Sequence, residues 1–234
     1  MRIILSSHLI APPNLQRVVQ ILNRSGQMPL NLHLIFSQDV HVTTYPPYTN
    51  HLLVPFASRI TTLTLKDVPI RQISDLPSGL FPHLERLAFK LAYQKDDTDN
   101  ELEGHDCVIH LFQIAPALKR LSLNKDLWFR SQARRASIWR KAIIPIPWGQ
   151  LTHYIDADEV YGAASDFVET LSKMKNIEYL AVKTKSLQLL NLPHPPPSSP
   201  IPLHSLKHLS LDFYFLAGPG FFPDCFDVFE FENL

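Results

Sequence analysis

The residues of this chain that could bind a metal ion or transfer a proton are its 11 histidines and its two cysteines. The closely spaced histidines form two pairs, His105 with His110 and His204 with His208. Asp106 and Cys107 follow His105, but neither a Cys-x-x-Cys nor a His-Glu-x-x-His arrangement accompanies these nominal zinc ligands. We therefore expect structural or surface histidines and no metal site.

Motifs for nucleophilic catalysis or phosphate binding are absent from the sequence. There is no Gly-x-Gly-x-x-Gly, P-loop or Gly-x-Ser-x-Gly motif, and seven glycines are few for a loop that cradles phosphate. The acidic segment from Ala92 to Asp106 offers carboxylates to calcium, but it lacks the spacing of an EF-hand, so we interpret it as a solvated loop. The sequence predicts a protein that is not an enzyme, with no catalytic residue and no cofactor.

A repeated phrase predicts the elements of the fold. Each copy has an apolar residue, two other residues, a second apolar residue, one other residue and a third apolar residue, and its last part alternates as in a half-buried strand. The copies are Ile60-Leu63-Leu65, Leu84-Leu87-Phe89, Leu118-Leu121-Leu123, Ile177-Leu180-Val182 and Leu206-Leu209-Leu211, with a weaker one from Leu151. Their first residues lie 24, 34, 33, 26 and 29 positions apart, somewhat longer than the usual leucine-rich repeat of about 20–29 residues.

One such strand cannot bury itself, whereas stacked copies share one core. We predict an α/β fold, an irregular leucine-rich-repeat solenoid with a curved, mainly parallel sheet and with helices and loops on its convex side. The leucines expected in the core are Leu63, Leu65, Leu87, Leu121, Leu123, Leu180, Leu209 and Leu211.

The chain is expected to form a single domain over residues 1–234. Residues 12–36 are predicted to form a capping helix and a strand, with Asn14 as the helix N-cap and Gly26 just beyond the helix end. The repeats are expected over residues 60–215.

Convex-side helices are predicted at Val108–Ala115 and at Asp166–Lys175, the second with Ser165 as its cap. The proline-rich segment 191–202 is expected to be an extended loop. The aromatic tail, residues 216–234, leaves two explanations open, a truncated chain or an unusual capping strand.

Composition narrows the class of partner. The 22 basic and 22 acidic side chains balance, so we expect no charge-driven binding to nucleic acid or to a membrane surface. Two cysteines are too few for a disulfide scaffold, which favours a reducing compartment, the cytoplasm or the nucleus. The apolar run at residues 1–12 is short for a signal peptide, and we expect a soluble monomer.

The order of several motifs resembles the leucine-rich-repeat region of F-box proteins of mushroom-forming (basidiomycete) fungi. The stretch Pro147-Trp148-Gly149-Gln150-Leu151-Thr152-His153 is similar to that family's Pro-Trp-x-x-Leu-Thr signature. The other matching stretches are residues 22–32, with Arg-Ser-Gly before Pro-Leu, and the strand segments 58–65, 81–87 and 115–123.

The resemblance implies a non-catalytic module for protein–protein interaction, like the substrate-recognition region of an SCF-type ubiquitin ligase. The F-box itself has no room before the helix expected at Asn14, so recruitment to a ligase is not carried over. The alternative is a truncated structural paralogue without ligase-adaptor function.

Residues between the inward apolar positions are expected to face outward on the concave side of the sheet. Basic and aromatic residues flank a row of mostly small ones, which suits an acidic or phosphorylated segment of a protein partner. The alternative is that these charges only keep the sheet solvated and free of edge pairing. The expected partner-binding residues are Thr62, Lys66, Arg86, Lys90, Arg120, His153, Tyr179, Lys183 and His208.

Asp156 occupies an inward position in the weak repeat copy. Burial of an unpaired carboxylate costs several kcal/mol, so we expect a bulge or register shift between Tyr154 and Asp156.

Overall fold

The fold is described from a computed structural model of the chain. It describes residues 1–6, 12–35, 48–69, 73, 76–92, 109–123, 145–156, 169–184, 201–213 and 229–230. The chain divides into two compact units, and each is described by itself. Unit 1 comprises Met1–Leu118 and Ala142–Ile146, and unit 2 comprises Lys119–Lys141 and Pro147–Leu234.

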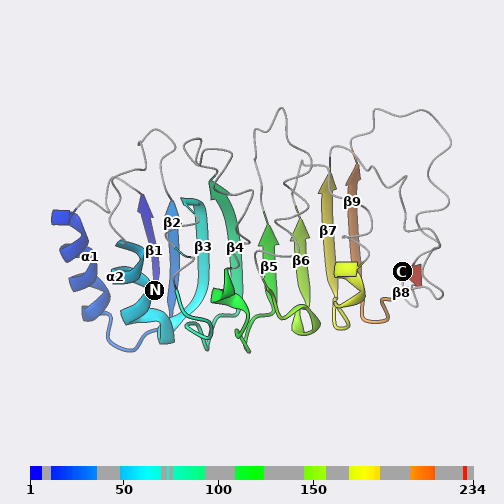
Figure 1. Ribbon diagram of the computed structural model, residues 1–234, viewed down its shortest axis with the longest axis horizontal. Helices are drawn as coiled ribbons and strands as arrows, with labels where there is room; N and C mark the ends of the chain where they lie inside the picture. Colours follow the sequence, from blue (N-terminus) through cyan, green and yellow to red (C-terminus); the bar gives the residue numbers. More distant parts are fainter. Residues whose placement is uncertain are drawn as a thin grey trace, which may run out of the picture. The chain divides into compact units, whose positions relative to one another are not determined.

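Unit 1 contains four parallel strands that lie side by side in chain order (Figure 1). They are β1 (Arg2–Ser6), β2 (Leu30–Ile35), β3 (Ile60–Pro69) and β4 (Arg86–Ala92). The pairing of β3 with β4 shifts register between Lys66 and Val68. Strand β1 was not predicted from the sequence, and it makes β2 an inner strand of the unit.

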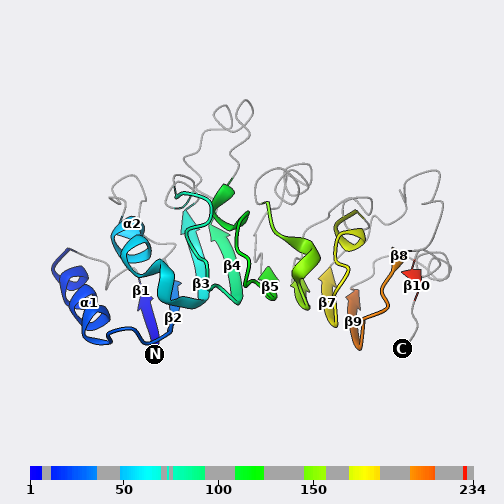
Figure 2. The ribbon, with the colours of Figure 1, turned by 90° about the horizontal axis from the view of Figure 1, so that it is seen from below.

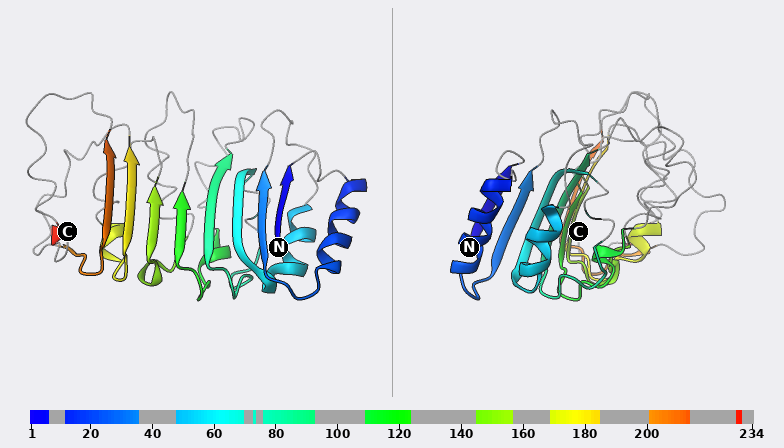
Figure 3. Two further views of the ribbon diagram at one scale, coloured as in Figure 1. Left: turned by 180° about the vertical axis from the view of Figure 1, so that it is seen from behind. Right: turned by 60° about the vertical axis from the view of Figure 1, so that its left-hand side comes forward.

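Unit 2 contains four further parallel strands, also adjacent in chain order (Figure 3). They are β5 (Arg120–Leu123), β6 (His153–Asp156), β7 (Tyr179–Thr184) and β9 (His208–Phe213). A separate short pair joins β8 (Ile201–Pro202) to β10 (Phe229–Glu230), also in parallel. The described chain thus has an α/β fold with parallel strands and few helices.

The inward side chains of these strands form the core. Six of the eight leucines predicted there are buried, Leu63, Leu65, Leu87, Leu121, Leu123 and Leu180. Leu209 is only half-buried, so the prediction is wrong for it, and the side chain of Leu211 lies outside the described residues. Leu209 pairs with Leu180 of β7, but β9 comes last in the strand order of unit 2, so packing covers it less completely.

The first apolar residue of each repeated phrase, which we call the anchor, is the most deeply buried. The anchors are Ile60, Leu84, Leu118, Leu151, Ile177 and Leu206, each at most 1% exposed. Five of them end a tight turn in which the anchor amide donates to the carbonyl three residues earlier, at Ala57, Phe81, Ala115, Trp148 and Leu203. The turn therefore delivers each of these anchors into the core just before its strand begins.

In unit 2, the carbonyl that follows an anchor binds the start of the next strand. The Lys119 carbonyl accepts the amides of Thr152 and His153 at 2.9 and 3.1 Å. The Thr152 carbonyl accepts those of Glu178 and Tyr179 at 2.8 and 3.0 Å. The Glu178 carbonyl continues the pattern with Lys207 and His208 at 2.8 and 3.0 Å. This repeated contact fixes the register of β5, β6, β7 and β9.

The expected N-terminal helix is present as α1 (Pro12–Arg24). It begins at Pro12, so the prediction of Asn14 as its cap is wrong; proline suits the first turn because its missing N–H has no helical partner. Gly26 follows the helix with φ of 58°, as expected of a glycine stop. The Arg59 guanidinium closes this end by donating to the carbonyls of Leu22 and Met28.

The remaining helices differ from the predicted ones. Helix α2 (Tyr48–Leu53) and the 3-10 helix η3 (Val54–Arg59) were not predicted, and Figure 2 shows both on one side of the unit 1 strands. The helix expected at Val108–Ala115 is reduced to the 3-10 turn η5 (His110–Phe112). The stacking of Phe112 between Phe81 and Phe89, with ring centroids 6.1 Å apart, fills this part of the core without a longer helix.

Residues 169–172 are helical within the second predicted helix, whereas Ser165 lies outside the described residues. The other 3-10 turn of unit 2 is η6 (Trp148–Gln150). Within the described residues, every helix falls short of the length or apolarity required to cross a membrane.

Strand β6 is regular, so the predicted bulge at Asp156 is wrong. Residues 153–156 pair in continuous register with both β5 and β7. Asp156 is 1% exposed and points inward, and its carboxylate accepts a hydrogen bond from the Tyr154 hydroxyl at 2.8 Å. The Tyr154 ring also meets Trp148 edge to face at 5.7 Å. A buried donor two residues away, on the same side of the strand, thus takes the place of water.

Substitution of Leu121 by alanine tests whether the inward leucines hold unit 2 together. We expect Leu121→Ala to lower the free energy of unfolding by about 2–5 kcal/mol, because it leaves a cavity in a close-packed core. Ile155→Ala, at an outward position 38% exposed on the neighbouring strand, is the control and should cost less than about 1 kcal/mol. Equal losses in chemical denaturation would contradict this account of the core.

Removal of the Tyr154 hydroxyl tests how the buried carboxylate is stabilised. Tyr154→Phe keeps the ring against Trp148 but withdraws a donor from Asp156, so we expect a loss of about 1.5–3 kcal/mol in denaturant unfolding. The additional change Asp156→Leu should recover much of this loss, because no buried carboxylate remains. An unchanged stability of Tyr154→Phe would show that the hydroxyl is not needed.

Candidate protein-binding face

The side of each sheet segment opposite the buried leucines is the candidate site, and we call it the outward face. Its positions follow from the register, since side chains alternate along a strand. In unit 1 the Cα partners run Arg2, Asn31, Thr62 and Arg86 in a first row, and Ile4, His33, Thr64 and Ala88 in a second. The third row consists of Ser6, Ile35, Lys66 and Lys90.

Charge on the outward face of unit 1 is one-sided. Its basic positions are Arg2, Lys66, Arg86 and Lys90, and none of the positions in the three rows is aspartate or glutamate. Asp67 of β3 lies at the register shift between Lys66 and Val68, outside these rows. Arg2, Lys66 and Arg86 are exposed. The arrangement can therefore attract a ligand that carries negative charge.

His33 lies in the middle of this basic region and is half-buried. Burial lowers the pKa of its imidazole below the ordinary histidine value, and the positive charge of Arg2 lowers it further. Arg2 comes from β1, the strand that the sequence did not predict. The neutral form of His33 is consequently favoured in the folded protein.

In unit 2 the first row of the outward face consists of one arginine followed by three residues with ring side chains. Arg120, His153, Tyr179 and His208 are Cα partners on four successive strands, and we call them the donor row. The rings of His153 and Tyr179 stack with centroids 5.8 Å apart and planes 19° apart. The rings of Tyr179 and His208 lie 6.1 Å apart at 47°.

The Thr152 hydroxyl makes two polar contacts beside the donor row, one of them to the His153 ring. The Thr152 hydroxyl lies 2.9 Å from Nδ1 of His153, and it also donates to the Lys119 carbonyl at 3.3 Å. Next to the row, the Lys207 ammonium group lies 3.2 Å from the carboxylate of Glu178, the residue before Tyr179. The positive charge of Lys207 therefore offsets this negative charge. Both side chains of that pair are well exposed, so the pair adds little stability.

The row beside the donor row consists mostly of small side chains. Ser122, Ala181 and Ser210 are small, and only Ile155 projects, at 38% exposed. Ring side chains on one side and small ones on the other make a shallow step along the outward face of unit 2.

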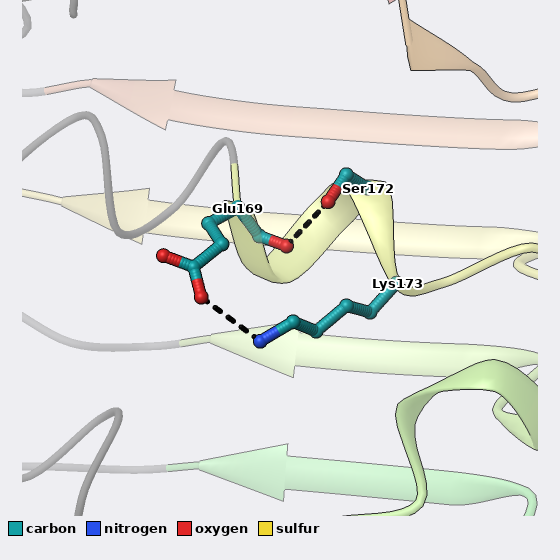
Figure 4. Close-up of polar contacts among 3 residues, drawn as sticks. All are labelled: Glu169, Ser172 and Lys173. Atoms are coloured by element: carbon teal, nitrogen blue, oxygen red, sulfur yellow. Dashed lines mark hydrogen bonds and ion pairs between the residues drawn. The ribbon is translucent and has the colours of Figure 1, made fainter.

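The opposite side of unit 2 carries an ion pair within its helical segment. Figure 4 shows the helical residues 169–172, where Lys173 donates to Glu169 at 2.9 Å and the Ser172 hydroxyl donates to the Glu169 carbonyl at 2.7 Å. Leu171 and Met174 of this segment are buried.

The predicted partner-binding residues occupy equivalent register positions within each unit. Thr62 pairs with Arg86 and Lys66 with Lys90 in unit 1, and Lys183 pairs with Asp212 in unit 2. The side chains of Lys90 and Lys183 lie outside the described residues. Arg86 and Arg120 belong to different units.

Sequence analysis missed the contribution of β1 and β2 to this face. Arg2, Asn31 and His33 extend the rows that were predicted to begin at β3. The signal was the short apolar run Ile3-Ile4-Leu5 between two polar residues, which is also consistent with a short strand.

The histidine pairs singled out for metal binding are not brought together as ligand sets in the described residues. No group of three or more histidine, cysteine, aspartate or glutamate side chains is placed there to hold a metal ion. His204 lies in the turn before β9 and His208 is exposed on that strand, as expected. His105 and the acidic segment that precedes it lie outside the described residues, apart from Ala92 at the end of β4.

Comparison with known proteins identifies no relative of this chain: no family model, no curated protein and no solved structure matches it.

The lowered pKa of His33 predicts a pH-dependent stability. As pH falls from about 8 to about 5, the unfolded chain takes up the His33 proton before the folded chain does, so the stability contributed by neutral His33 is lost. We therefore expect the free energy of unfolding of the wild type to decrease, relative to that of His33→Asn, as pH falls. Denaturant unfolding across this range measures the difference, and a constant value would contradict the prediction.

Proposed function

We propose that this chain is a non-catalytic protein–protein interaction module whose outward face binds an acidic or phosphorylated segment of a protein partner. It would be a leucine-rich-repeat solenoid, similar to the substrate-recognition region of a fungal F-box protein of an SCF-type ubiquitin ligase. The proposal concerns recognition alone, and it places the protein in the cytoplasm or the nucleus as a monomer.

The repeated geometry supports the solenoid part of this proposal. Anchors, tight turns and carbonyl contacts recur before successive parallel strands, so each repeat is completed by its neighbour. Such repeats typically present a broad open sheet face to a macromolecular partner. The order of motifs that resembles the F-box family includes the segment from Pro147 to His153, which forms the turn and the start of β6.

The observation that carries the binding part is the charge of unit 1. The three paired rows of its outward face include two arginines and two lysines but no acidic residue, although the whole chain has equal numbers of acidic and basic residues. Asp67 of β3 lies at the register shift between Lys66 and Val68, outside these rows. Solubility alone would be served by charges of either sign. Arginine guanidinium groups bind carboxylate and phosphate in a bidentate manner, which suits acidic or phosphorylated side chains.

Charge reversal on the outward face tests this function. The probes are a fluorescein-labelled peptide of glutamate and serine, its phosphoserine counterpart and a glutamine-for-glutamate version, with binding followed by fluorescence anisotropy. We expect the wild type to bind the first two and not the third. The double variant Arg86→Glu/Arg120→Glu should bind at least about tenfold more weakly, with an unchanged melting temperature because both side chains are exposed.

The matched control is Lys173→Glu/Lys175→Glu, which changes net charge equally through exposed residues of the helical side of unit 2. Its affinity should stay near that of the wild type. Equal weakening of both double variants would show that net charge, not the outward face, governs binding. Failure of the wild type to bind either charged peptide would contradict the proposed function and favour a truncated structural paralogue.

A further inference from the structure

We propose that the donor row of unit 2 recognises an extended segment with acidic side chains at every second residue. This inference rests on the proposed function and adds a sequence rule for the partner. It comes from the spacing and the polar atoms of Arg120, His153, Tyr179 and His208, which the register places on successive strands.

The spacing of the rings is the first argument. Their centroids follow one another at 5.8 and 6.1 Å. An extended chain advances about 3.3 Å per residue, so side chains on the same side of it recur about every 6.6 Å. A partner segment that runs across the strands can therefore present one acidic side chain to each ring in turn. Neighbouring acidic residues would point to opposite sides and meet the row only half as often.

The orientation of the rings is the second argument. Because His153 and Tyr179 stack on each other, each ring turns one face toward the other, and the ring edges are available for contact with a ligand. Imidazole nitrogens and the phenol oxygen lie at ring edges, where they donate hydrogen bonds to carboxylates. Nucleobases instead stack on exposed ring faces, so this geometry favours an acidic peptide over single-stranded nucleic acid.

The contact between Thr152 and His153 is compatible with a proton on Nδ1 of the imidazole. A hydroxyl that donates its single proton to the Lys119 carbonyl, at 3.3 Å, presents a lone pair to Nδ1 of His153, at 2.9 Å. The ring then donates from Nδ1, and a second proton on Nε2 would make the imidazole positive. A carboxylate beside the row would stabilise this positive form.

Charge around the row is consistent with an acidic ligand. Arg120 is exposed at one end, and the carboxylate of Glu178 is engaged by Lys207 at 3.2 Å. Asp212, the single acidic residue among the outward positions of the described unit 2 strands, lies in the third row rather than in the donor row. The small side chains of Ser122, Ala181 and Ser210 leave room for the backbone of the segment beside the rings, and Ile155 offers it an apolar contact.

Two peptides of identical composition test the rule. One alternates glutamate with serine, and the other has all its glutamates in one block followed by its serines. We expect the wild-type chain to bind the alternating peptide at least about tenfold more tightly in fluorescence anisotropy. Tyr179→Phe, which keeps the ring but removes its hydroxyl, should reduce this preference, and His153→Ala/His208→Ala should abolish it. Lys173→Ala, on the helical side, is the control and should keep it.

Each outcome separates the rule from the function on which it rests. Equal binding of both peptides, or a preference unchanged in the histidine double variant at an unchanged melting temperature, would overturn the inference and leave the proposed function standing. Absence of binding to either peptide would overturn both. Tighter binding of a single-stranded oligouridylate probe than of the alternating peptide would overturn the inference in favour of nucleic acid.

Discussion

The structure depends on the burial of a single apolar residue ahead of each repeated strand. A strand such as β5, with four residues and two inward leucines, buries too little surface to persist alone. The anchor adds a third fully buried side chain, and in unit 2 the carbonyl that follows it accepts two amides of the next strand. Packing and hydrogen bonding therefore select the same parallel register, which explains why the strands remain aligned although the distance between anchors varies from 24 to 34 residues.

Because the anchors and the inward side chains form the core, the outward side chains do not contribute to it. Every second side chain of a strand points away from the anchors, so its chemistry can change with little effect on packing. In unit 1 these positions carry basic side chains from β1, β3 and β4, and in unit 2 they carry the stacked rings. On the helical side, by contrast, Lys173 is paired with Glu169.

The sequence predicted the parts of the fold that depend on local periodicity. The inward leucines of β3, β4 and β5 are buried as predicted. Their burial could be predicted because the alternation of apolar and polar residues is complete within a few positions. The predictions that failed depend on contacts distant in sequence. Arg59 closes the end of α1 across 37 residues, and β1 forms by pairing with β2, which follows it only after helix α1. Asp156 appeared incompatible with an inward position, because a hydrophobic pattern does not show that the Tyr154 hydroxyl supplies a buried donor. The candidate site was likewise predictable only in its local features. Register placed its residues in rows, whereas the ring stacking and the influence of Arg2 on His33 required three-dimensional positions.

Fold and candidate site meet most closely at Thr152. Its amide donates to the Lys119 carbonyl, its own carbonyl accepts the amides of Glu178 and Tyr179, and its hydroxyl lies 2.9 Å from the His153 ring. The backbone of this residue therefore aligns β5, β6 and β7, while its side chain orients a ring of the donor row. Valine has nearly the same shape but no hydroxyl, so it would leave the backbone contacts in place and remove the side-chain contacts to His153 and to the Lys119 carbonyl. The alignment of the strands and the polarity of the outward face are thus separable chemically, even at the position where one residue serves both.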